Sequence, residues 1–272
     1  MEEKRIACVI LPTFREAENV AVLLPRIFDQ GARITTHELH VVVVDDDSSD
    51  GTADCVREAM LEYPNLHLLS GKRKGLGEAY KRGINDALAT LAPDLILQMD
   101  ADLQHDPREL PGFIERCNSS HDLVIGSRFA PGGALENFPW YRRMISLAGT
   151  WLVCLVAGLD SIDDCTSGYR CIRASLLPLC DLAELSTRGY SFQSSLLCEL
   201  VWNGARVTEI PIIFAARRSG ESKLSLRDQV EFVLNLFWLL RRRGSRRAIA
   251  RLPLPKASPE ADFASNSQRR TL

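Results

Sequence analysis

Two aspartates spaced two residues apart follow an apolar run, a pattern typical of a site for a divalent cation. The run "DLILQM" leads into "DADLQHDP", so Asp100 and Asp102 come directly after a predicted strand. If the chain stays extended there, both carboxylates project to one side and Gln104 continues the series. These oxygens suit Mg²⁺ or Mn²⁺, with diphosphate oxygens completing the shell. A capped turn accounts for Asp106 before Pro107, but a turn needs no acid at the end of a buried strand.

A second acidic cluster, "HVVVVDDDSSDGT", follows another predicted strand. Carboxylates at this position can accept hydrogen bonds from the ring N–H, exocyclic amine or ribose hydroxyls of a nucleotide. We therefore predict that Asp45 and Asp46 bind a nucleotide. The cation is assigned to Asp100 and Asp102, which have the alternating spacing and are followed by the Gln104 amide. A helix cap and a solvated turn account for Ser49 and Asp50.

A glycine-rich basic segment, "GKRKGLGEAYKRG", could cradle phosphate at a helix N-terminus. The basic residues 72–74 precede Gly75 and Gly77 there. The segment is neither a GxGxxG fingerprint, because Tyr80 occupies the place of the last glycine, nor a P-loop. Taken alone it is weak evidence, since the glycines can serve only to permit a turn.

Arginines recur in the predicted loops, and guanidinium forks suit phosphate oxygens. Any one of them is more often a surface charge. Several converging on the acidic end of one sheet would form a pocket for an anionic substrate. The candidates are Arg128, Arg142, Arg143, Arg170, Arg217 and Arg218.

Strand and helix patterns alternate through the first half of the chain and predict a parallel α/β sheet covered on both faces. Ligands gather at the carboxyl ends of strands in such sheets, and every cluster described above follows a predicted strand. Apolar runs predict strands at about 5–14, 40–44, 65–70, 94–99 and 122–129; helices are predicted at about 17–28, 48–60, 75–88 and 107–117. Further along, helices are predicted at about 140–158 and 192–203, a strand at 206–217 and an amphipathic segment at 226–243.

Composition predicts one catalytic domain over residues 1–243, followed by a basic and then polar, disordered tail over residues 244–272. With 46% hydrophobic residues the chain can bury a full core, and a net charge of −2 gives no reason to expect nucleic acid. Eight cysteines without a CxxC pair, and no signal peptide, favour a reducing cytoplasm. No apolar run reaches the roughly 18–20 residues of a membrane span.

Seven segments of the chain, in their order and spacing, resemble the polyprenol (dolichol) phosphate mannose synthases of the inverting glycosyltransferase family 2. The segments are "LPTFREAENV", "VVDDDSSDGT", "KGLGEAY", "MDADLQHDP", "IGSRF", "DDCTSGYR" and "RRSGESKL". The similarity covers about residues 5–240. It implies the GT-A fold, and an enzyme that transfers mannose from GDP-mannose to the phosphate of a membrane polyprenol with a divalent cation.

The resemblance also implies roles for individual residues. Pro12, Thr13, Phe14, Glu16, Asp45 and Asp46 would line the nucleotide site, with Lys74 and Ala101 also on the nucleotide sugar. Asp100, Asp102 and Gln104 would hold the cation; Arg128, Arg143 and Arg217, with Ser146 and Lys223, would meet the acceptor phosphate and the donor diphosphate. Asp100, Asp102, Arg128 and Arg217 are the expected catalytic residues. The chain departs from the family at Phe14, more often Tyr, and at Ser195, where many relatives have Glu.

A lipid acceptor requires contact with a membrane, and the transmembrane pair that some relatives append is absent. Residues 140–158 and 226–243 are core helices or interfacial helices. Phe232, Phe237 and Trp238, followed by an arginine cluster, suit an anionic membrane surface, which predicts a peripheral enzyme at the cytoplasmic face. A membrane-anchoring subunit is a further expected partner.

Three other functions compete with this interpretation. The same fold could transfer glucose or another sugar, to polyprenyl phosphate or to a hydroxyl group. A non-catalytic sugar-nucleotide-binding subunit is disfavoured because the metal set is intact. A nicotinamide-dependent dehydrogenase is disfavoured because "LPTFREAEN" has no glycine after the first strand.

Overall fold

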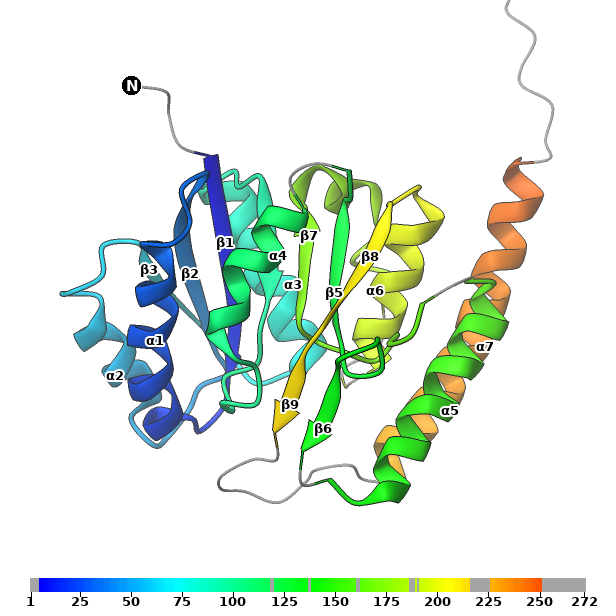
Figure 1. Cartoon of the computed structure of the whole chain (residues 1–272), viewed down its shortest axis with the longest axis horizontal. Coiled ribbons are helices and arrows are strands. Elements are labelled where there is room, and N and C mark those ends of the chain that lie inside the picture. The colour runs from blue at the N-terminus through cyan, green and yellow to red at the C-terminus, as the bar shows by residue number, and fades with distance from the viewer. Residues whose placement is uncertain are drawn as a thin grey trace, which may run out of the picture.

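A seven-stranded sheet of order β3-β2-β1-β4-β7-β5-β8 organises the chain (Figure 1). The structure is a computed structural model that describes residues 5–117, 120–136, 138–159, 162–185, 189, 191–215 and 226–250. The strands of this sheet are β1 (Arg5–Thr13), β2 (His37–Asp45), β3 (Leu66–Ser70), β4 (Leu95–Gln98), β5 (Leu123–Ser127), β7 (Arg170–Arg173) and β8 (Val207–Pro211). A second sheet pairs β6 (Ala134–Glu136) with β9 (Ile213–Ala215).

The central strands are apolar on both faces because helices cover both faces of the sheet. One face carries α1 (Ala17–Gly31), α2 (Thr52–Ala59) and α4 (Leu110–Arg116), the last preceded by η1 (Pro107–Glu109); the other carries α3 (Leu76–Thr90) and α6 (Ser191–Trp202) (Figure 1). In β2, residues 41–44 are all valine and fully buried, with alternate residues in the two opposite cores.

Strand direction brings one set of chain ends to the same edge of the sheet. The register pairs Thr13 with Asp45, so β1 and β2 end at the same level. Strand β7 runs antiparallel to β4 and β5, and Arg170 at its start pairs with Gln98 at the end of β4. The loop that leads into β7 therefore arrives at the edge where the parallel strands end.

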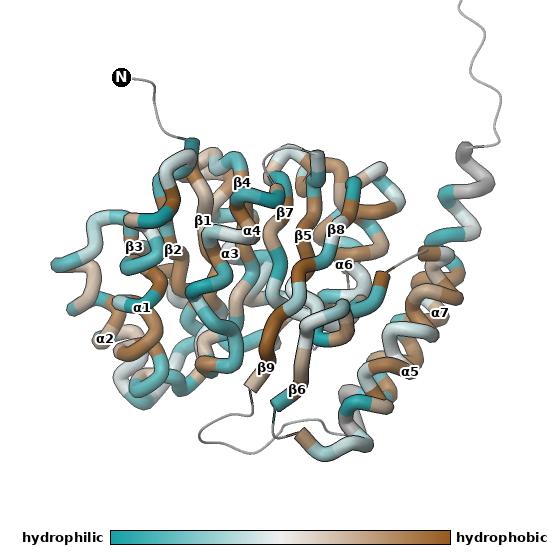
Figure 2. Tube along the Cα trace, in the orientation of Figure 1, coloured by the Kyte–Doolittle hydropathy of each residue, from teal (hydrophilic) through white to brown (hydrophobic). Residues whose placement is uncertain are grey.

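Two further helices, α5 (Trp140–Ala157) and α7 (Leu226–Ala250), pack against each other beside the sheet (Figures 1 and 2). Two polar residues of α7, Glu231 and Asn235, face the protein. Asn235 is buried and accepts a hydrogen bond from the Ser195 hydroxyl at 2.7 Å, while Glu231 accepts the Gly189 N–H at 2.8 Å. Ser195, the departure from the family pattern, thus serves to join α6 to α7.

Arginines of α7 also point inward and fix this helix against α6 and α5. Arg242 and Arg246 both pair with Glu199, a fully buried residue of α6. Arg243 donates to the carbonyl of Val156 at 2.9 Å, where the negative end of the α5 dipole favours a cation. Gly158 (φ +67°) makes room for Arg243, since a Cβ there would lie 2.0 Å from its guanidinium.

The predicted α/β architecture with a mainly parallel sheet is confirmed, and β7 is the one antiparallel strand of the seven-stranded sheet among the described residues. Strands β6 and β7 were not predicted from the sequence. The single strand expected over 206–217 is wrong, since it divides into β8 and β9, and α7 continues seven residues beyond 243 to Ala250. The expected disordered tail from about residue 252 lies outside the described residues.

The close approach of α3 to the sheet depends on Gly83. A Cβ at this position would lie 2.6 Å from the Ile10 Cγ2 atom and 2.7 Å from the Val44 Cγ2 atom. We expect Gly83→Ala to lower the free energy of unfolding by about 1–3 kcal/mol through overpacking. Urea unfolding of the purified variant measures this.

The matched control is Gly112→Ala in α4, where a Cβ meets nothing within 4 Å. This change should leave stability unchanged or raise it by up to about 1 kcal/mol, because alanine favours helix. Equal effects at the two positions would contradict the packing argument.

Candidate active site

The carboxyl edge of the sheet gathers most of the described residues that the sequence analysis selected. Thr13 ends β1, Asp45 ends β2, and Asp100 and Arg128 follow β4 and β5. The edge can be divided into an acidic side beside β1 and β2 and an arginine side beside β5.

Asp45 is 1% exposed and surrounded by donors from two neighbouring loops. Its Oδ1 atom accepts the hydroxyls of Thr13 at 3.1 Å and Ser48 at 2.6 Å, and its Oδ2 atom accepts the Ser48 N–H at 3.0 Å. These bonds hold the loop after β2 against the end of β1. The side chain of Asp45 is therefore already engaged within the protein.

Asp46 is also buried and forms an ion pair with Arg82 of α3 at 3.0 Å. Burial raises the pKa of Asp46 above its ordinary value, and the positive charge of Arg82 only partly offsets this rise. The same guanidinium donates to the Lys72 carbonyl at 3.2 Å, which fixes the basic segment before α3.

A pocket of about 310 Å³ opens beside this acidic side. Its lining comes from the ends of β2 and β3 and from the start of α2: Asp45, Asp47, Ser48, Ser49, Gly51, Ala53, Asp54, Arg57 and Ser70. Phe14 directly follows Thr13 in the chain. Its half-buried ring is covered by the guanidinium of Arg73, which lies 3.7 Å from the ring centroid. This is a cation–π contact at which a planar base could also stack.

Asp50 joins two helices rather than capping one. Its carboxylate accepts the N–H of Ala17 at the start of α1 and the N–H of Thr52 at the start of α2, each at 3.2 Å. The N-cap position of α2 belongs to Gly51, with φ +88°. The expected structural role of Asp50 is confirmed, but the expected place of the cap is wrong by one residue.

Asp100 lies at the centre of the edge and is oriented by neighbours from three segments. The buried Tyr80 of α3 donates its hydroxyl to the Asp100 Oδ1 atom at 2.8 Å. The backbone N–H of Asp100 donates to His105 Nδ1 at 3.0 Å, and burial lowers the pKa of His105, which favours its neutral form. The Asp100 carboxylate also lies beside Gly168, where a Cβ would be 3.6 Å from its Oδ2 atom.

The expected extended geometry after Asp100 is wrong. Strand β4 ends at Gln98 and the chain bends over residues 101–103, with Leu103 at φ +62°. The turn is closed by the Gln104 N–H, which donates to Asp102 Oδ1 at 3.2 Å. Such a turn forms because an aspartate side chain readily accepts the N–H two residues further on.

Two carboxylates nevertheless share this location. Asp100 and Asp102 both raise the pKa of the buried Tyr80, after the larger effect of burial, so both act on one small region. The Gln104 amide nitrogen donates to the Ala215 carbonyl at 2.7 Å, which fixes the direction of its carboxamide. Across the described residues, no three His, Cys, Asp or Glu side chains are grouped to hold a metal. A cation bound by Asp100 and Asp102 would therefore need further oxygen ligands, from the Gln104 amide and from a bound ligand.

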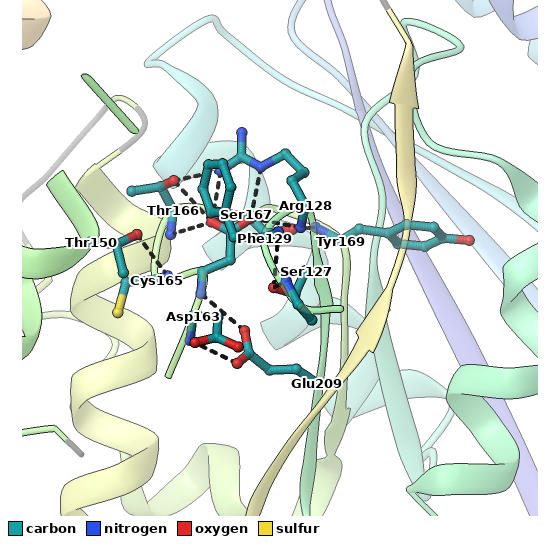
Figure 3. Close-up of polar contacts among 12 residues, drawn as sticks. Ser127, Arg128, Phe129, Thr150, Asp163, Cys165, Thr166, Ser167, Tyr169 and Glu209 are labelled. Atoms are coloured by element: carbon teal, nitrogen blue, oxygen red, sulfur yellow. Dashed lines mark hydrogen bonds and ion pairs between the residues drawn. The ribbon is translucent and has the colours of Figure 1, made fainter. Parts of the chain in front are cut away.

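The arginine side is built around Arg128 and Asp164 (Figure 3). Arg128 donates through Nε to Asp164 Oδ2 and through Nη2 to Asp164 Oδ1, each at 2.7 Å. Its Nη2 atom also contacts the Thr166 hydroxyl. Asp164 is fully buried. Burial by itself raises the pKa of Asp164, but the hydrogen bonds and charge of Arg128 outweigh this effect, and the pKa lies below its ordinary value.

The loop that carries Asp164 is held from two other directions. Glu209 of β8 accepts the N–H of Asp163 at 2.7 Å and that of Asp164 at 2.9 Å (Figure 3). The Cys165 N–H donates to the Thr150 hydroxyl of α5 at 3.2 Å. The loop thus connects α5, β8 and the arginine side of the edge.

Arg170 does not belong to the arginine pocket that the sequence suggested. It is the first residue of β7, fully buried, and donates to the carbonyls of Gln193 at 2.5 Å and Cys165 at 2.9 Å. Burial lowers the pKa of Arg170 to about 10. Because the neighbouring strands enclose it, this guanidinium stabilises the fold beneath the edge and cannot reach a ligand at the surface.

The other predicted residues occupy varied positions. Pro12 and Ala101 are buried, Glu16 accepts a hydrogen bond from Asn19, and Lys74 is exposed. Arg143 is exposed and Ser146 half-buried, about one turn apart on α5. The side chain of Arg142, and all of Arg217, Arg218 and Lys223, lie outside the described residues.

Two residues of the site were not selected from the sequence. Tyr80 was noticed only as the residue that breaks a glycine fingerprint, and Asp164 was quoted only within "DDCTSGYR". Neither residue stands out from the helix or strand pattern near it in the sequence. Their partners, Asp100 and Arg128, are 20 and 36 residues away, so spacing gives no indication of either contact.

Comparison with known proteins identifies the family. The family model for glycosyl transferase family 2 matches residues 8–178. The chain is 40% identical over 228 residues to an undecaprenyl-phosphate mannosyltransferase of Micrococcus luteus, covering 84% of this chain and 90% of that one. It is 36% identical over 219 residues to a polyprenol monophosphomannose synthase of Mycolicibacterium smegmatis, covering 80% of each. A dolichol-phosphate mannosyltransferase of Pyrococcus furiosus is 35% identical over 240 residues, which are 64% of its length.

Solved structures share the fold at lower identity. The glucosyl-3-phosphoglycerate synthase of Mycobacterium tuberculosis, in complex with Mn²⁺, UDP and glucosyl-3-phosphoglycerate, has a TM-score of 0.61 at 18% identity and covers 88% of this chain and 80% of its own. The mannosyl-3-phosphoglycerate synthase of Rubrobacter xylanophilus has a TM-score of 0.60 at 18% identity, covering 95% and 80%.

The sheet is therefore that of the GT-A fold of a glycosyltransferase. The chain belongs to glycosyltransferase family 2.

The ion pair between Asp46 and Arg82 generates a test of the acidic side. We expect Arg82→Gln to lower the free energy of unfolding at pH 7 by about 2 kcal/mol, because a buried carboxylate loses its cation. The raised pKa of Asp46 means that its protonation favours the folded state as the pH falls. The deficit should therefore be present at pH 7 and shrink at pH 5 in urea unfolding experiments.

The control is the double variant Arg82→Gln/Asp46→Asn, which removes both charges and should recover part of the lost stability. A deficit that is the same at both pH values, and the same in the double variant, would show that the packing of Arg82 matters rather than its charge.

Proposed function

We propose that this enzyme transfers a mannosyl residue from GDP-mannose to the phosphate of a membrane polyprenol, with inversion and with a divalent cation. The observation that carries the proposal is the pairing of an acidic side and an arginine side on one edge, in a chain 35–40% identical to named polyprenol-phosphate and dolichol-phosphate mannosyltransferases. The donor would lie across the acidic side. The acceptor phosphate would lie on the arginine side.

The nucleoside would enter beside β1 and β2. The pocket next to Asp45 and the ring of Phe14 offer a polar wall and a stacking surface. Because Asp45 is already bonded to Thr13 and Ser48, its first task is to shape this wall. Contacts to base or ribose then come from the rim that Asp45 supports, together with Pro12, Glu16, Asp46, Lys74 and the backbone of Ala101.

The donor set fits a hard divalent cation. Asp100 and Asp102 supply carboxylate oxygens and Gln104 an amide oxygen, a combination that suits Mg²⁺ or Mn²⁺ once diphosphate oxygens are added. When bound, such a cation would neutralise charge on the departing nucleoside diphosphate. Tyr80 would hold the Asp100 carboxylate in one orientation through its 2.8 Å hydrogen bond.

The chemistry of a phosphate acceptor matches the groups on the arginine side. A phosphate monoester is already anionic near pH 7, so it needs little help from a general base. What it needs is orientation, and Arg128 and Arg143 could supply this together with Ser146, Arg217 and Lys223. In-line attack by a phosphate oxygen would then form the new bond as the diphosphate leaves from the opposite side of the sugar. A sugar hydroxyl acceptor would instead require a nearby base.

The direct test combines donors with a short polyprenyl phosphate. Purified enzyme should produce a polyprenyl-phosphate sugar fastest from GDP-mannose when GDP-glucose and UDP-glucose are compared under the same conditions. Asp102→Asn should lower turnover by several orders of magnitude and also weaken Mn²⁺ binding, measured by the loss of the free-ion electron paramagnetic resonance signal. Circular dichroism should show an intact fold.

Each outcome decides a separate part of the proposal. Faster transfer from UDP-glucose would replace the donor. Near-wild-type turnover by the Asp102→Asn variant would overturn the assignment of the cation. No transfer to the lipid phosphate with any donor would overturn the acceptor.

The face of α5 and α7 that points away from the sheet provides the membrane surface in this proposal. It exposes large apolar side chains at helical spacing, which we call the apolar face: Trp140, Tyr141, Met144, Ile145, Trp151 and Leu155 on α5, with Val230, Val233, Leu234, Phe237 and Leu240 on α7. Exposed large apolar side chains of this kind are typical of an interaction site, and two amphipathic helices can lie within a lipid headgroup region.

The expected membrane contacts need correction. Of the aromatic residues named from sequence, only Phe237 is on the apolar face, since Phe232 and Trp238 pack against the core. Two arginines of the cluster are also turned inward, because Arg242 and Arg246 pair with Glu199, while Arg241 is exposed. Apolar insertion, rather than arginine charge, would therefore provide most of the attachment. No described helix is long and apolar enough to cross a bilayer. We place the enzyme at the cytoplasmic face, where a membrane-anchoring subunit could assist it.

Replacing apolar side chains on this face should release the enzyme from lipid. We expect Phe237→Glu and Trp151→Glu each to reduce co-sedimentation with anionic liposomes by several-fold, because a charge must then enter the headgroup region. The matched control is Leu61→Glu after α2, since Leu61 is 89% exposed but lies away from the apolar face. Binding that is unchanged in all three variants would exclude this surface.

A further inference from the structure

The two edges of the Arg128 guanidinium are used differently. The edge formed by Nε and Nη2 is occupied by the Asp164 carboxylate. The Nη1 atom has no hydrogen-bond partner among the described residues, and one guanidinium nitrogen of Arg128 carries no dashed line in Figure 3. A bidentate pair of this kind fixes both the position and the plane of a guanidinium.

We infer that Asp164 is the positioning residue for the acceptor: it holds Arg128 so that the Nη1 edge meets an anionic oxygen of the acceptor phosphate. The inference rests on the proposed function and adds a residue to which neither the sequence pattern nor the similarity to known relatives assigns a role. Asp164 itself would not touch the substrate. It would act through Arg128.

The surroundings of Asp164 are suited to this task because the carboxylate cannot move. Besides the guanidinium, it accepts the backbone N–H groups of Arg128, Thr166 and Ser167 at 3.1–3.2 Å. It is fully buried, so each bond lies in a medium where electrostatic interactions are stronger than in water. The side chain of Arg128 is only 12% exposed, so little of it is free to take other orientations.

The same loop reaches the donor side of the edge. Ser167, whose N–H is bonded to Asp164, is followed by Gly168, which lies against the Asp100 carboxylate. The loop thus sets the position of Arg128 relative to Asp100. A fixed separation is what an in-line transfer between a bound donor and a bound acceptor requires.

The positioning role and a simple charge effect predict opposite results. Asp164 is a negative charge beside a site for an anion, so by charge alone its removal should improve acceptor binding. If Asp164 positions Arg128, its removal should impair acceptor binding instead. The sign of the change in the acceptor KM therefore separates the two explanations.

The experiment uses full-length Asp164→Asn with GDP-mannose and a short polyprenyl phosphate. We expect the acceptor KM to rise about tenfold or more, and the donor KM to stay within about twofold of wild type. Arg128→Ala should raise the acceptor KM as well. The double variant Asp164→Asn/Arg128→Ala should have an acceptor KM no higher than that of Arg128→Ala alone, because Asp164 acts on the acceptor through that side chain.

Glu209→Gln is the matched control, since Glu209 supports the same loop through the N–H groups of Asp163 and Asp164 but has no bond to Arg128. It should leave the acceptor KM within about twofold of wild type. Thermal unfolding of each variant, followed by circular dichroism, shows which of them are folded at the assay temperature. If Asp164→Asn is unfolded there, Thr166→Val replaces it, since this variant removes the other contact of Arg128 Nη2 and should also raise the acceptor KM.

Three results would overturn the inference: a lower or unchanged acceptor KM in Asp164→Asn, an equal rise in Glu209→Gln, or additive effects in the double variant. Failure of the proposed function gives a different result, because the wild-type enzyme itself would then not transfer mannose to the lipid phosphate.

Discussion

A buried carboxylate must be surrounded by hydrogen-bond donors, and this constraint arranges the whole carboxyl edge of the sheet. Among the aspartates at this edge, the buried Asp45, Asp46 and Asp164 and the half-buried Asp100 have different partners: Asp45 has the hydroxyls of Thr13 and Ser48, Asp46 has Arg82, Asp100 has Tyr80, and Asp164 has Arg128. Apart from Ser48, each partner comes from another part of the chain. Satisfying these carboxylates therefore also joins the loops that must carry a substrate.

The partners divide the edge into regions with different electrostatics. Around Asp46 burial dominates, so its pKa is raised despite Arg82, whereas around Asp164 the donors dominate and its pKa is lowered. In the proposed function, an acidic side that binds a cation and a guanidinium side would separate the charges of the donor diphosphate and the acceptor phosphate. The two anions can then approach one sugar without facing each other unscreened.

Hydrogen bonds and ion pairs made inside the protein also explain how the apolar face is formed. In α7 the polar side chains Glu231 and Asn235 and the cation Arg242 point toward the protein, where Gly189, Ser195 and the buried Glu199 receive them. With these polar residues used internally, most of the large side chains on the outer surface of the helix are apolar. Thr150 of α5 then connects this surface to the Asp164 loop, so the helices that carry the apolar face and the candidate acceptor site share one support.

Most of the fold was predictable because its information is local. Valine runs buried on both faces and the alternation with amphipathic helices predict the parallel sheet, and the acids that follow β2 and β4 locate the edge that matters. The short β7 escaped prediction because "RCIR" has no strand-like periodicity of its own, and its pairing with β4 and β5 decides its conformation. The turn after Asp100 escaped because the Gln104 N–H bonds to Asp102 and ends the extended chain.

The sequence by itself determined the class of fold, the acidic edge and the candidate residues for the proposed donor and acceptor sites. Only the tertiary structure decided which of them are available. It buried Arg170 beneath the edge, paired Arg128 with Asp164, and turned Arg242 and Arg246 of α7 inward. The physical reason is that a charge on a flexible side chain has no fixed partner in the sequence. Its partner is selected by burial, across separations such as the 36 residues between Arg128 and Asp164.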